Sequence, residues 1–375
     1  MPRTPQNWAG AGALWITAAG WAGALRRRGF ASSVVTPGGP LTEEACLSQT
    51  STASLSSRGR TSRVPAALRV LARDGQRSVE MLRYRRRAPE LAEVSNANAG
   101  PIELVWQHHE LFHTAGSKIA EVAGAPRIEY VHAPIVWEAR RWGVERRVSG
   151  GPIIRLGEVP ALRSADLVAC VTEEVASEVV RLGVSSDRVL VSPMGIDPER
   201  FSPDLVPDAD RMALDHLGDF VVGWVGSMRR FHALDLALEA VAIARAQGCR
   251  VGMAIAGDGQ DRPRIESIVD DHGLGDAVQL LGQISNHDVP RLLASVDAAV
   301  ITAGADQEFH YSPLKLREYL AMARPVAVPA TGEIVRYLDD ERTGMLYEPG
   351  DAVGLARVFT KLADDAVLRS TVGVA

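Results

Sequence analysis

Short apolar segments alternate with helical patterns along nearly the whole chain, and this alternation limits the fold more than any other feature. In the first half, segments typical of strands are found at 102–106, 127–131, 167–171 and 189–192. After a Gly- and Pro-rich break at 194–203, the alternation restarts with apolar runs at 220–225, 251–256, 278–281, 298–301 and 326–328. Strands that alternate with helices predict parallel sheets covered by helices on both faces. We therefore expect an α/β protein with two doubly wound, Rossmann-like domains, residues 1–198 and 199–375, and ligands in the cleft between them.

Length, composition and charge agree with two domains and exclude some partners. A chain of 375 residues is too long for one ordinary core. The charged content is 23%, and 41 basic residues against 46 acidic ones give a net charge of -5. This balance gives no support for nucleic-acid binding by bulk electrostatics. Three scattered cysteines (Cys46, Cys170 and Cys249) have no metal-ligand or paired spacing, as expected for a protein of the reducing cytoplasm.

An uncharged stretch at 8–25, followed by three arginines at 26–28, resembles a membrane anchor in length. It is rich in Ala and Gly and lacks the Leu, Ile and Val content of a spanning helix. The arginines occupy a last helical turn, where the helix dipole favours cations, and Gly29 suits the C-cap. We interpret the stretch as a helix of a cytoplasmic protein. A peripheral contact with the inner face of a membrane stays open, for example through the basic run at 83–87.

The segment from Ser312 to Val326 predicts an anion-binding helix start followed by a buried strand. Ser312 suits an N-cap, and Pro313 suits the first helical position, where no N–H is needed. Lys315 then lies in the first turn, where the helix dipole repels a cation unless an anion binds the free N–H groups. Glu318 projects from the same face. A cation for phosphate and a carboxylate for both ribose hydroxyls suit a nucleoside diphosphate. A surface helix with an internal Lys–Glu pair is the alternative.

Several ordered segments resemble the retaining, nucleotide-sugar-dependent glycosyltransferases of family four (glycosyl transferases group 1), specifically a branch with Ser-Pro-Leu-Lys-Leu at the helix start. The segments are 163–172, 191–197 with Arg200 and Phe201, 225–227, 256–259, 281–282 and 310–326. The resemblance implies the GT-B fold, with two Rossmann-like domains facing a cleft. It also implies transfer of a hexosyl-type sugar from a nucleoside diphosphate sugar to a hydroxyl, with retention of anomeric configuration. It implies neither a metal ion nor a cofactor beyond the donor.

The resemblance assigns roles to individual residues on the donor side. Glu318 would hold the ribose, and the backbone N–H groups at the helix start would contact the diphosphate. His132, after a strand of the first domain, would touch the donor sugar near the reacting centre. The expected catalytic residues are His132, Arg229 and Lys315. The expected donor-site residues are Gly10, Gly12, Gly226, Arg229, Arg230, His232, His310, Ser312, Pro313, Leu314, Lys315 and Glu318.

Three positions depart from the family pattern. The first of the family's two glutamates falls on His310, although the Ser-Pro-Leu-Lys-Leu branch also lacks that acid. The usual Arg and Lys after the first strand of the second domain fall on Ser227 and His232. Arg229 and Arg230 lie close enough to replace them, because a guanidinium can bind phosphate through two parallel hydrogen bonds. His232 adds charge only when protonated, which is partial at neutral pH for a reference pKa of about 6.5.

The acceptor side is less defined by the sequence. His108 and His109 follow a strand of the first domain, and Glu138 and Arg141 lie just beyond His132. All four are candidate acceptor contacts, although we favour an ordinary amphipathic helix as the explanation for the last two. The acceptor itself would be a hydroxyl-bearing glycan, lipid-linked sugar or small molecule. The high Ala and Arg content indicates a GC-rich bacterial genome, which leaves polysaccharide biosynthesis and natural-product glycosylation both open.

Both ends of the chain look short for the family. The strand expected before the first glycine loop and the final helix that crosses back to the first domain are not recognisable. We therefore keep two alternatives to an active transferase. One is a non-catalytic nucleotide-sugar-binding or assembly-partner protein of the same fold, and the other is a sugar-nucleotide epimerase.

Overall fold

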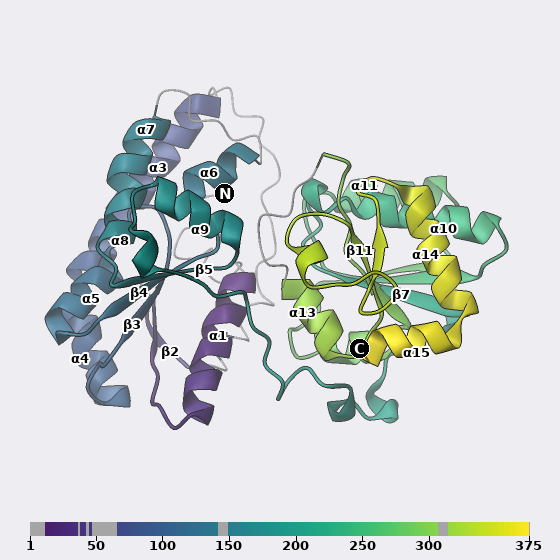
Figure 1. The fold of residues 1–375 in the computed structure, drawn as a ribbon, viewed down its shortest axis with the longest axis horizontal. Coiled ribbons are helices and arrows are strands. Elements are labelled where there is room, and N and C mark those ends of the chain that lie inside the picture. Colours follow the sequence, from purple (N-terminus) through teal and green to yellow (C-terminus); the bar gives the residue numbers. More distant parts are fainter. Residues whose placement is uncertain are drawn as a thin grey trace. The chain divides into compact units, whose positions relative to one another are not determined.

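The structure is a computed structural model and describes residues 12–36, 38–42, 45–46, 66–141, 149–306 and 314–374. The chain divides into two compact units, Met1–Met194 and Gly195–Ala375 (Figure 1). The division falls inside the Gly- and Pro-rich break, slightly before the expected boundary. Each unit has a parallel sheet flanked by helices, so the predicted α/β class with two Rossmann-like domains is confirmed.

A four-stranded parallel sheet forms the centre of the first unit, in the order β3-β4-β5-β6. Its strands are β3 (Val105–His108), β4 (Arg127–Val131), β5 (Leu167–Cys170) and β6 (Val189–Val191). An antiparallel pair, β1 (Val34–Thr36) and β2 (Gly39–Leu41), lies outside this sheet. β3 starts and ends later than predicted. The polar residues Gln107 and His108 extend it, because they pair in register with Glu129 and Tyr130 of β4.

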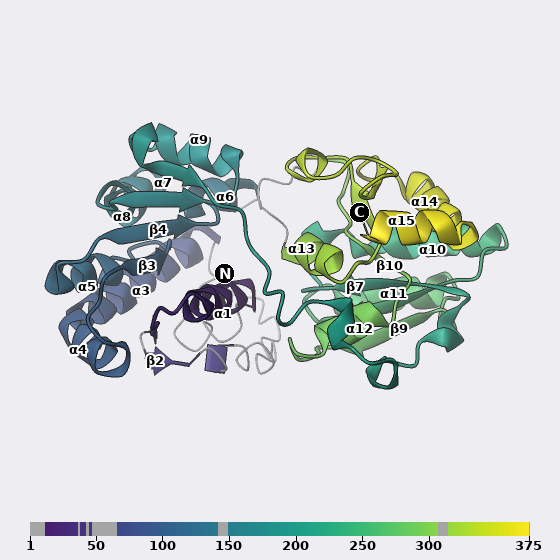
Figure 2. The ribbon, with the colours of Figure 1, turned by 60° about the horizontal axis from the view of Figure 1, so that its bottom comes forward.

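Helices cover both faces of the four-stranded sheet, and Figure 2 shows α1 and α9 on opposite faces. Trp21 of α1 packs against Trp106 and Tyr130, with ring centroids 5.4 and 6.2 Å away. In the part of the chain that the structure describes, we find no helix with both the length and the apolar character needed to cross a membrane. The helices of this unit are α1 (Gly12–Arg27), α3 (Ala66–Arg86), α4 (Ala88–Ala99), α5 (Ala115–Ala123), α6 (Ile135–Arg141), α7 (Gly150–Ile153), the π-helix η3 (Ile154–Glu158), α8 (Val159–Arg163), α9 (Glu173–Arg181) and the 3-10 turn η4 (Ser186–Arg188).

The second unit has a six-stranded parallel sheet in the order β12-β11-β10-β7-β8-β9. The strand order reverses between β7 and β10, and ligands of open α/β sheets bind at the carboxyl ends of strands at such a switch point. β12 was not predicted. The strands are β7 (Phe220–Val225), β8 (Val251–Ala256), β9 (Val278–Gly282), β10 (Ala298–Val300), β11 (Val326–Pro329) and β12 (Met345–Tyr347).

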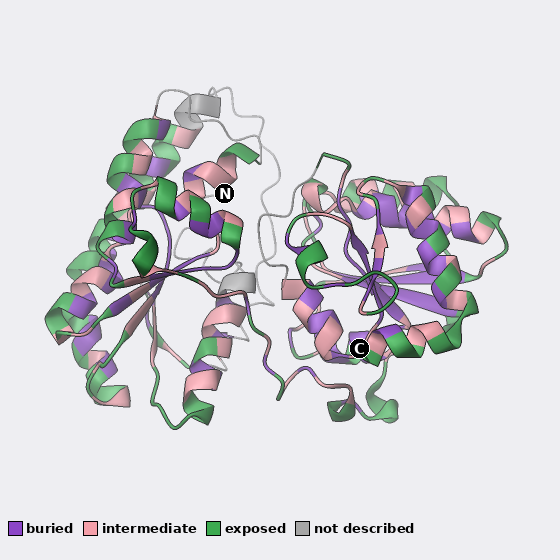
Figure 3. Cartoon of the chain, viewed as in Figure 1, coloured by how far each residue is buried: buried purple, intermediate pink, exposed green. Residues whose placement is uncertain are grey.

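Alternate residues of β7 bury their side chains in the core on one face of the sheet, together with α10 and α14. Tyr319 and Leu316 of α13 belong to the core on the other face. Figure 3 shows buried residues along the strands and the inner sides of these helices. The last helix, α15, was not predicted, and it buries Val372 in the first of these cores. The helices are α10 (Leu234–Ala246), α11 (Arg262–Asp271), α12 (Val289–Ala294), α13 (Leu314–Ala321), α14 (Ala352–Asp364) and α15 (Ala366–Val374), with 3-10 turns η5 (Pro203–Leu205), η6 (Asp208–Asp210), η7 (Asp215–Leu217), η8 (Arg230–His232) and η9 (Ile334–Arg336).

Candidate functional site

The segments that follow β7 and β10 are tied together at the switch point of the second unit. The N–H of Val225, the last residue of β7, donates to the hydroxyl of Tyr319 in α13 at 3.0 Å. Thr302, just after β10, donates its hydroxyl to the carbonyl of His232. These bonds join the loop after β7, the end of β10 and α13 into one edge, at the place where the topology predicts a ligand.

Lys315 lies in the first turn of α13, and its ammonium sits over the indole of Trp224, 4.1 Å from the ring centroid. Gly226 leaves room for it, since a Cβ at that position would lie 2.5 Å from Lys315 Nζ. Burial lowers the pKa of Lys315 to about 7, with Glu318 acting in the opposite direction. No ion pair of Lys315 is recorded among the described residues. The ammonium is therefore desolvated without an anionic contact, which suits an anion-binding group.

Glu318 lies one turn further along α13 and is 4% exposed. Burial raises the pKa of its carboxyl to about 7, while Lys315 and Arg200 act to lower it. Within the described ranges, the structure shows no hydrogen bond to this carboxylate. A buried carboxylate without hydrogen bonds is unfavourable, so Glu318 is a candidate acceptor for donors that a ligand supplies.

The loop after β7 carries the three predicted basic residues, Arg229, Arg230 and His232, which differ in exposure. Arg229 and Arg230 are exposed. The ring of His232 stands edge-on to Trp224, with centroids 5.9 Å apart. Burial, Lys315 and Arg229 together lower the pKa of His232 to about 2. The expectation of partial protonation was therefore wrong, because the neighbouring cations and the low-dielectric surroundings keep this imidazole neutral.

Glycines bring the loops after β7 and β8 into close backbone contact. The N–H of Gly226 donates to the carbonyl of Ala256 at 2.9 Å, and that of Met228 donates to the carbonyl of Asp258 at 2.9 Å. A Cβ on Gly257 would collide with the carbonyl of Gly226. The Gly-Asp-Gly turn therefore fixes the path of the loop that carries Arg229.

In the first unit, His132 and His108 stack at the carboxyl ends of adjacent strands. Their ring centroids are 5.2 Å apart and their planes 9° apart. Tyr130 meets the ring of His132 edge-on at 5.2 Å. Because His108 ends β3 and His132 follows β4, the parallel register brings the two imidazoles together. The structure thus unites the expected catalytic histidine with one of the expected acceptor-side residues.

His109 does not have the placement expected of an acceptor contact. Its side chain is 0% exposed, with Nδ1 3.0 Å from Glu129 Oε1 and Nε2 3.3 Å from Glu158 Oε1. Burial lowers the pKa of His109, but the hydrogen bonds to Glu129 and Glu158 outweigh this effect and raise it to about 9. Both ring nitrogens are used inside the protein, so this imidazole does not face an acceptor.

The other predicted residues have simpler placements. On α6, Arg141 pairs with Glu174 and lies over Trp137 at 4.1 Å, and Glu138 is half-buried. These contacts agree with an ordinary amphipathic helix, although they do not test acceptor binding. Gly12 begins α1, and Leu314 begins α13. Gly10, His310, Ser312 and Pro313 lie outside the described residues.

Some residues of the site were not predicted. Trp224 supports Lys315, and Tyr319 joins α13 to β7, yet an aromatic residue in a buried segment resembles any other core residue. Arg127 and Glu129 gave a clearer signal, because charges at alternate positions of an otherwise apolar strand require buried partners. Among the residues described, no group of His, Cys, Asp and Glu side chains is suited to hold a metal ion.

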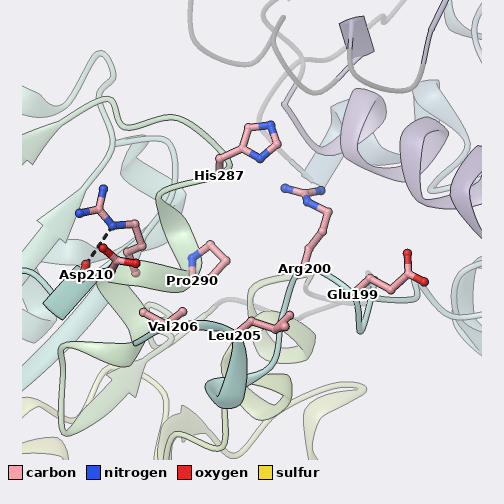
Figure 4. A pocket seen from close by; sticks show the side chains of 8 residues that line it. Glu199, Arg200, Leu205, Val206, Asp210, His287 and Pro290 are labelled. Carbon is pink, nitrogen blue, oxygen red and sulfur yellow. Dashed lines mark hydrogen bonds between the residues drawn. The ribbon is translucent and has the colours of Figure 1, made fainter. Parts of the chain in front are cut away.

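A cavity of about 320 Å³ opens beside the start of the second unit (Figure 4). Arg200, on its wall, donates to the side chain and the carbonyl of Asn286. The guanidinium of Arg200 also lowers the pKa of Glu318, which links this cavity electrostatically to α13. The lining residues are Glu199, Arg200, Leu205, Val206, Asp210, His287, Pro290 and Arg291.

Comparisons with known proteins agree with this geometry. Among curated proteins, the chain is 26% identical over 283 residues to the D-inositol 3-phosphate glycosyltransferase of Stackebrandtia nassauensis, covering 72% of this chain and 62% of that protein. It is 26% identical over 208 residues to the putative colanic acid biosynthesis glycosyltransferase WcaL of Escherichia coli, covering 54% and 50%. The chain therefore spans about half to two thirds of the length of these relatives.

Among solved structures, HepE of Anabaena in complex with UDP-glucose has a similar fold. The TM-score is 0.58 at 18% sequence identity, and the match covers 76% of this chain and 75% of that one. Residues 16–200 match the family described as Glycosyltransferase Family 4, and residues 219–365 match Glycosyl transferases group 1. The first unit therefore matches the family 4 glycosyltransferase model and the second unit the group 1 model, and the two parallel α/β units have the GT-B fold.

Proposed function

We propose that this protein transfers a sugar from a nucleoside diphosphate sugar to an acceptor hydroxyl, with retention of the anomeric configuration. One observation carries the proposal. Lys315 and Glu318, at the switch point of the second unit, are a desolvated cation and a buried carboxylate one helical turn apart, without hydrogen-bonding partners among the described residues. A diphosphate beside Lys315 and a ribose beside Glu318 would satisfy both groups.

In the proposed reaction, electrostatic stabilisation acts on the leaving group. The bond between the anomeric carbon and the diphosphate oxygen breaks, and negative charge collects on the diphosphate. Lys315 and the exposed guanidinium groups of Arg229 and Arg230 would stabilise that charge. The acceptor oxygen bonds to the anomeric carbon on the same face, and its proton passes to the leaving diphosphate. His132 would contact the sugar near this centre.

The related proteins guide the choice of substrate. HepE was solved with UDP-glucose, and the two curated relatives are named as glycosyltransferases for an inositol phosphate and for colanic acid biosynthesis. These names support a nucleotide-sugar donor and a hydroxyl-bearing acceptor, either a glycan or a small molecule. Since the cationic side chains would neutralise the diphosphate, we expect transfer to be independent of metal ions and insensitive to EDTA.

The direct test is a donor screen followed by mass spectrometry. Sugars linked to UDP, GDP, ADP and dTDP would be incubated with the protein and a mixture of hydroxyl acceptors. A glycosylated acceptor supports the proposal, and proton NMR of the product establishes whether the configuration is retained. Nucleotide binding without turnover would support a non-catalytic binding protein instead. A changed sugar nucleotide without acceptor product would indicate an epimerase.

Replacing Gly226 with alanine should reduce transfer by about 10- to 100-fold, because the new methyl group displaces the ammonium of Lys315 from Trp224. Gly248→Ala is a matched control, since Gly248 also has a positive φ (93°) but has open space around it. Both variants introduce backbone strain, but only Gly226→Ala displaces Lys315. A comparison of their kcat values therefore distinguishes the two effects. Equal kcat values for both variants would contradict the assigned role of Gly226.

The affinity for UDP-glucose should peak near pH 7. Above about pH 7, Lys315 of the free protein loses its proton, so binding an anion becomes weaker by up to about tenfold per pH unit. Below about pH 7, the carboxyl of Glu318 is protonated and accepts ribose hydrogen bonds less well. The affinity can be measured by calorimetric titration across this pH range. In Lys315→Met the decrease in affinity above pH 7 should disappear, and in Glu318→Gln the decrease below pH 7 should disappear. A flat profile for the unmodified protein would contradict both assignments.

A further inference from the structure

A chain of alternating charges runs through the interior of the first unit. Arg127 pairs with Glu129, Glu129 contacts Nδ1 of His109, and Nε2 of His109 contacts Glu158. The side chains of all four residues are at most 2% exposed. Buried charges are favourable only when each one is paired, and apolar residues of similar size would often stabilise a fold equally well. Four such residues in series therefore suggest a task beyond stability.

The strands and helices of this unit bring the chain together. Arg127 and Glu129 alternate along β4, so both side chains leave the sheet on the same face. Gln107, opposite Glu129 on β3, donates to the Glu129 carboxylate at 2.8 Å. Glu158 ends the π-helix η3, and π-helical turns occur frequently at functional sites.

The far end of this charge chain holds the segment that carries His132. Oε1 of Glu158 accepts the backbone N–H of Ile135 in addition to its contact with His109. Ile135 is the third residue after His132. The residue before it, Pro134, has no N–H to donate. The side chain of His132 also stacks on His108, the neighbour of His109 in sequence. The charge chain is therefore connected to the His132 segment through the N–H of Ile135 and to His108 through the backbone.

The charge on His109 completes this arrangement. Burial lowers the pKa of His109, but Glu129 and Glu158 outweigh it and raise the pKa to about 9, so the ring is an imidazolium at neutral pH. Burial lowers the pKa of the adjacent His113 to about 4, so His113 adds no charge. Arg127 forms an ion pair with Glu129, the carboxylate that also contacts His109. Since the folded-state pKa of His109 lies above the ordinary value, this stabilisation is present at neutral pH and is lost as the pH rises through about 9.

We infer that Glu158, supported by His109, is a positioning residue that fixes the His132 segment for sugar transfer. This inference rests on the proposed function, in which His132 contacts the reacting sugar. Oε1 of Glu158 contacts Nε2 of His109 and accepts the N–H of Ile135, and a carboxylate beside an imidazolium is a strong hydrogen-bond acceptor. Without either partner, the turn between β4 and α6 loses its anchor, and the ring of His132 moves relative to the substrate.

Glu158→Ala, Glu158→Gln and His109→Gln test this role. Hydrogen exchange of the Ile135 amide should become at least about tenfold faster in Glu158→Ala, because its acceptor is removed. The kcat for transfer should fall about 10- to 100-fold, as expected for a small misplacement of a reacting group, while the dissociation constant for UDP-glucose stays unchanged. Glu158→Gln keeps an oxygen acceptor and should restore part of both effects. In His109→Gln, exchange and kcat should change in the same direction as in Glu158→Ala.

Glu110→Gln is the matched control. Glu110 forms a buried ion pair with Arg77 in the same unit, with side chains 3% and 11% exposed, and this pair does not include Ile135. The control should lower the melting temperature comparably without accelerating exchange at Ile135 or lowering kcat. The inference is overturned if Glu158→Ala exchanges at the unmodified rate, or if Glu110→Gln changes kcat to the same extent. If the unmodified protein transfers no sugar from any donor, the proposed function fails, and exchange at Ile135 alone decides whether Glu158 anchors the segment.

Discussion

Replacement of Lys315 with methionine is expected to lower kcat for sugar transfer by about 10²- to 10³-fold, the loss typical of removing one preorganised electrostatic contact from a transition state. The ammonium lies over Trp224, next to the open space at Gly226, and pairs with no carboxylate in the described part of the chain. The diphosphate gains its charge as the glycosidic bond breaks, so the effect should fall mainly on kcat. Steady-state kinetics with UDP-glucose, or the best donor of the screen, measures it.

Lys361→Met provides the control for this substitution. Lys361 lies on α14 of the same unit, is 45% exposed and pairs with Glu341 at 2.6 Å. Removing an exposed pair changes stability by about 0–1 kcal/mol, so activity should be unaffected. A Lys315→Met enzyme with full kcat would show that this lysine does not touch the leaving group, and the candidate site would have to be placed elsewhere.

Glu318→Ala is expected to weaken nucleotide binding by about 100-fold or more, with the fold intact. Two hydrogen bonds from ribose hydroxyls to a buried carboxylate contribute about 1.5–3 kcal/mol each. The carboxylate is 4% exposed and has no hydrogen bond within the described residues, so its removal leaves no other protein group unsatisfied. Isothermal calorimetry with UDP measures the affinity, and circular dichroism confirms the fold.

A comparison between ribose and deoxyribose sharpens the Glu318 test. A nucleotide that lacks the 2′-hydroxyl should lose affinity in the unmodified protein but almost none in Glu318→Ala. Glu239→Ala, an exposed position on α10, should bind like the unmodified protein. Unchanged affinity in Glu318→Ala would remove the ribose assignment without affecting that of Lys315.

Much of the architecture could be predicted from the sequence because buried parallel strands are continuous apolar runs. The bounds of β7 and β8 were predicted from such runs. Helical spacing also placed Lys315 and Glu318 on one turn of α13. β3 was misplaced because its last residues, Gln107 and His108, are polar, and their pairing with β4 is visible only in the sheet.

The electrostatic state of the site could not be predicted, because it depends on residues far apart in sequence. The neutral state of His232 results from burial and from Lys315, which reaches it through the fold of the second unit. The enclosure of His109 needs Glu158, 49 positions away and held on a π-helix. The sequence shows which residues can ionise, whereas the packing of the folded chain determines whether their side chains are charged at neutral pH.

The burial of Lys315 and Glu318 on α13 has a consequence for protein engineering. Burial disfavours the charged forms of Lys315 and Glu318, so neutral residues at these positions should raise the melting temperature of the ligand-free protein. A library selected only for heat resistance would therefore enrich variants that lack the proposed donor-binding residues. Selection in the presence of saturating nucleotide should preserve these residues. A nucleotide that binds only the folded protein stabilises variants that keep Lys315 and Glu318, although both residues lower the stability of the ligand-free protein.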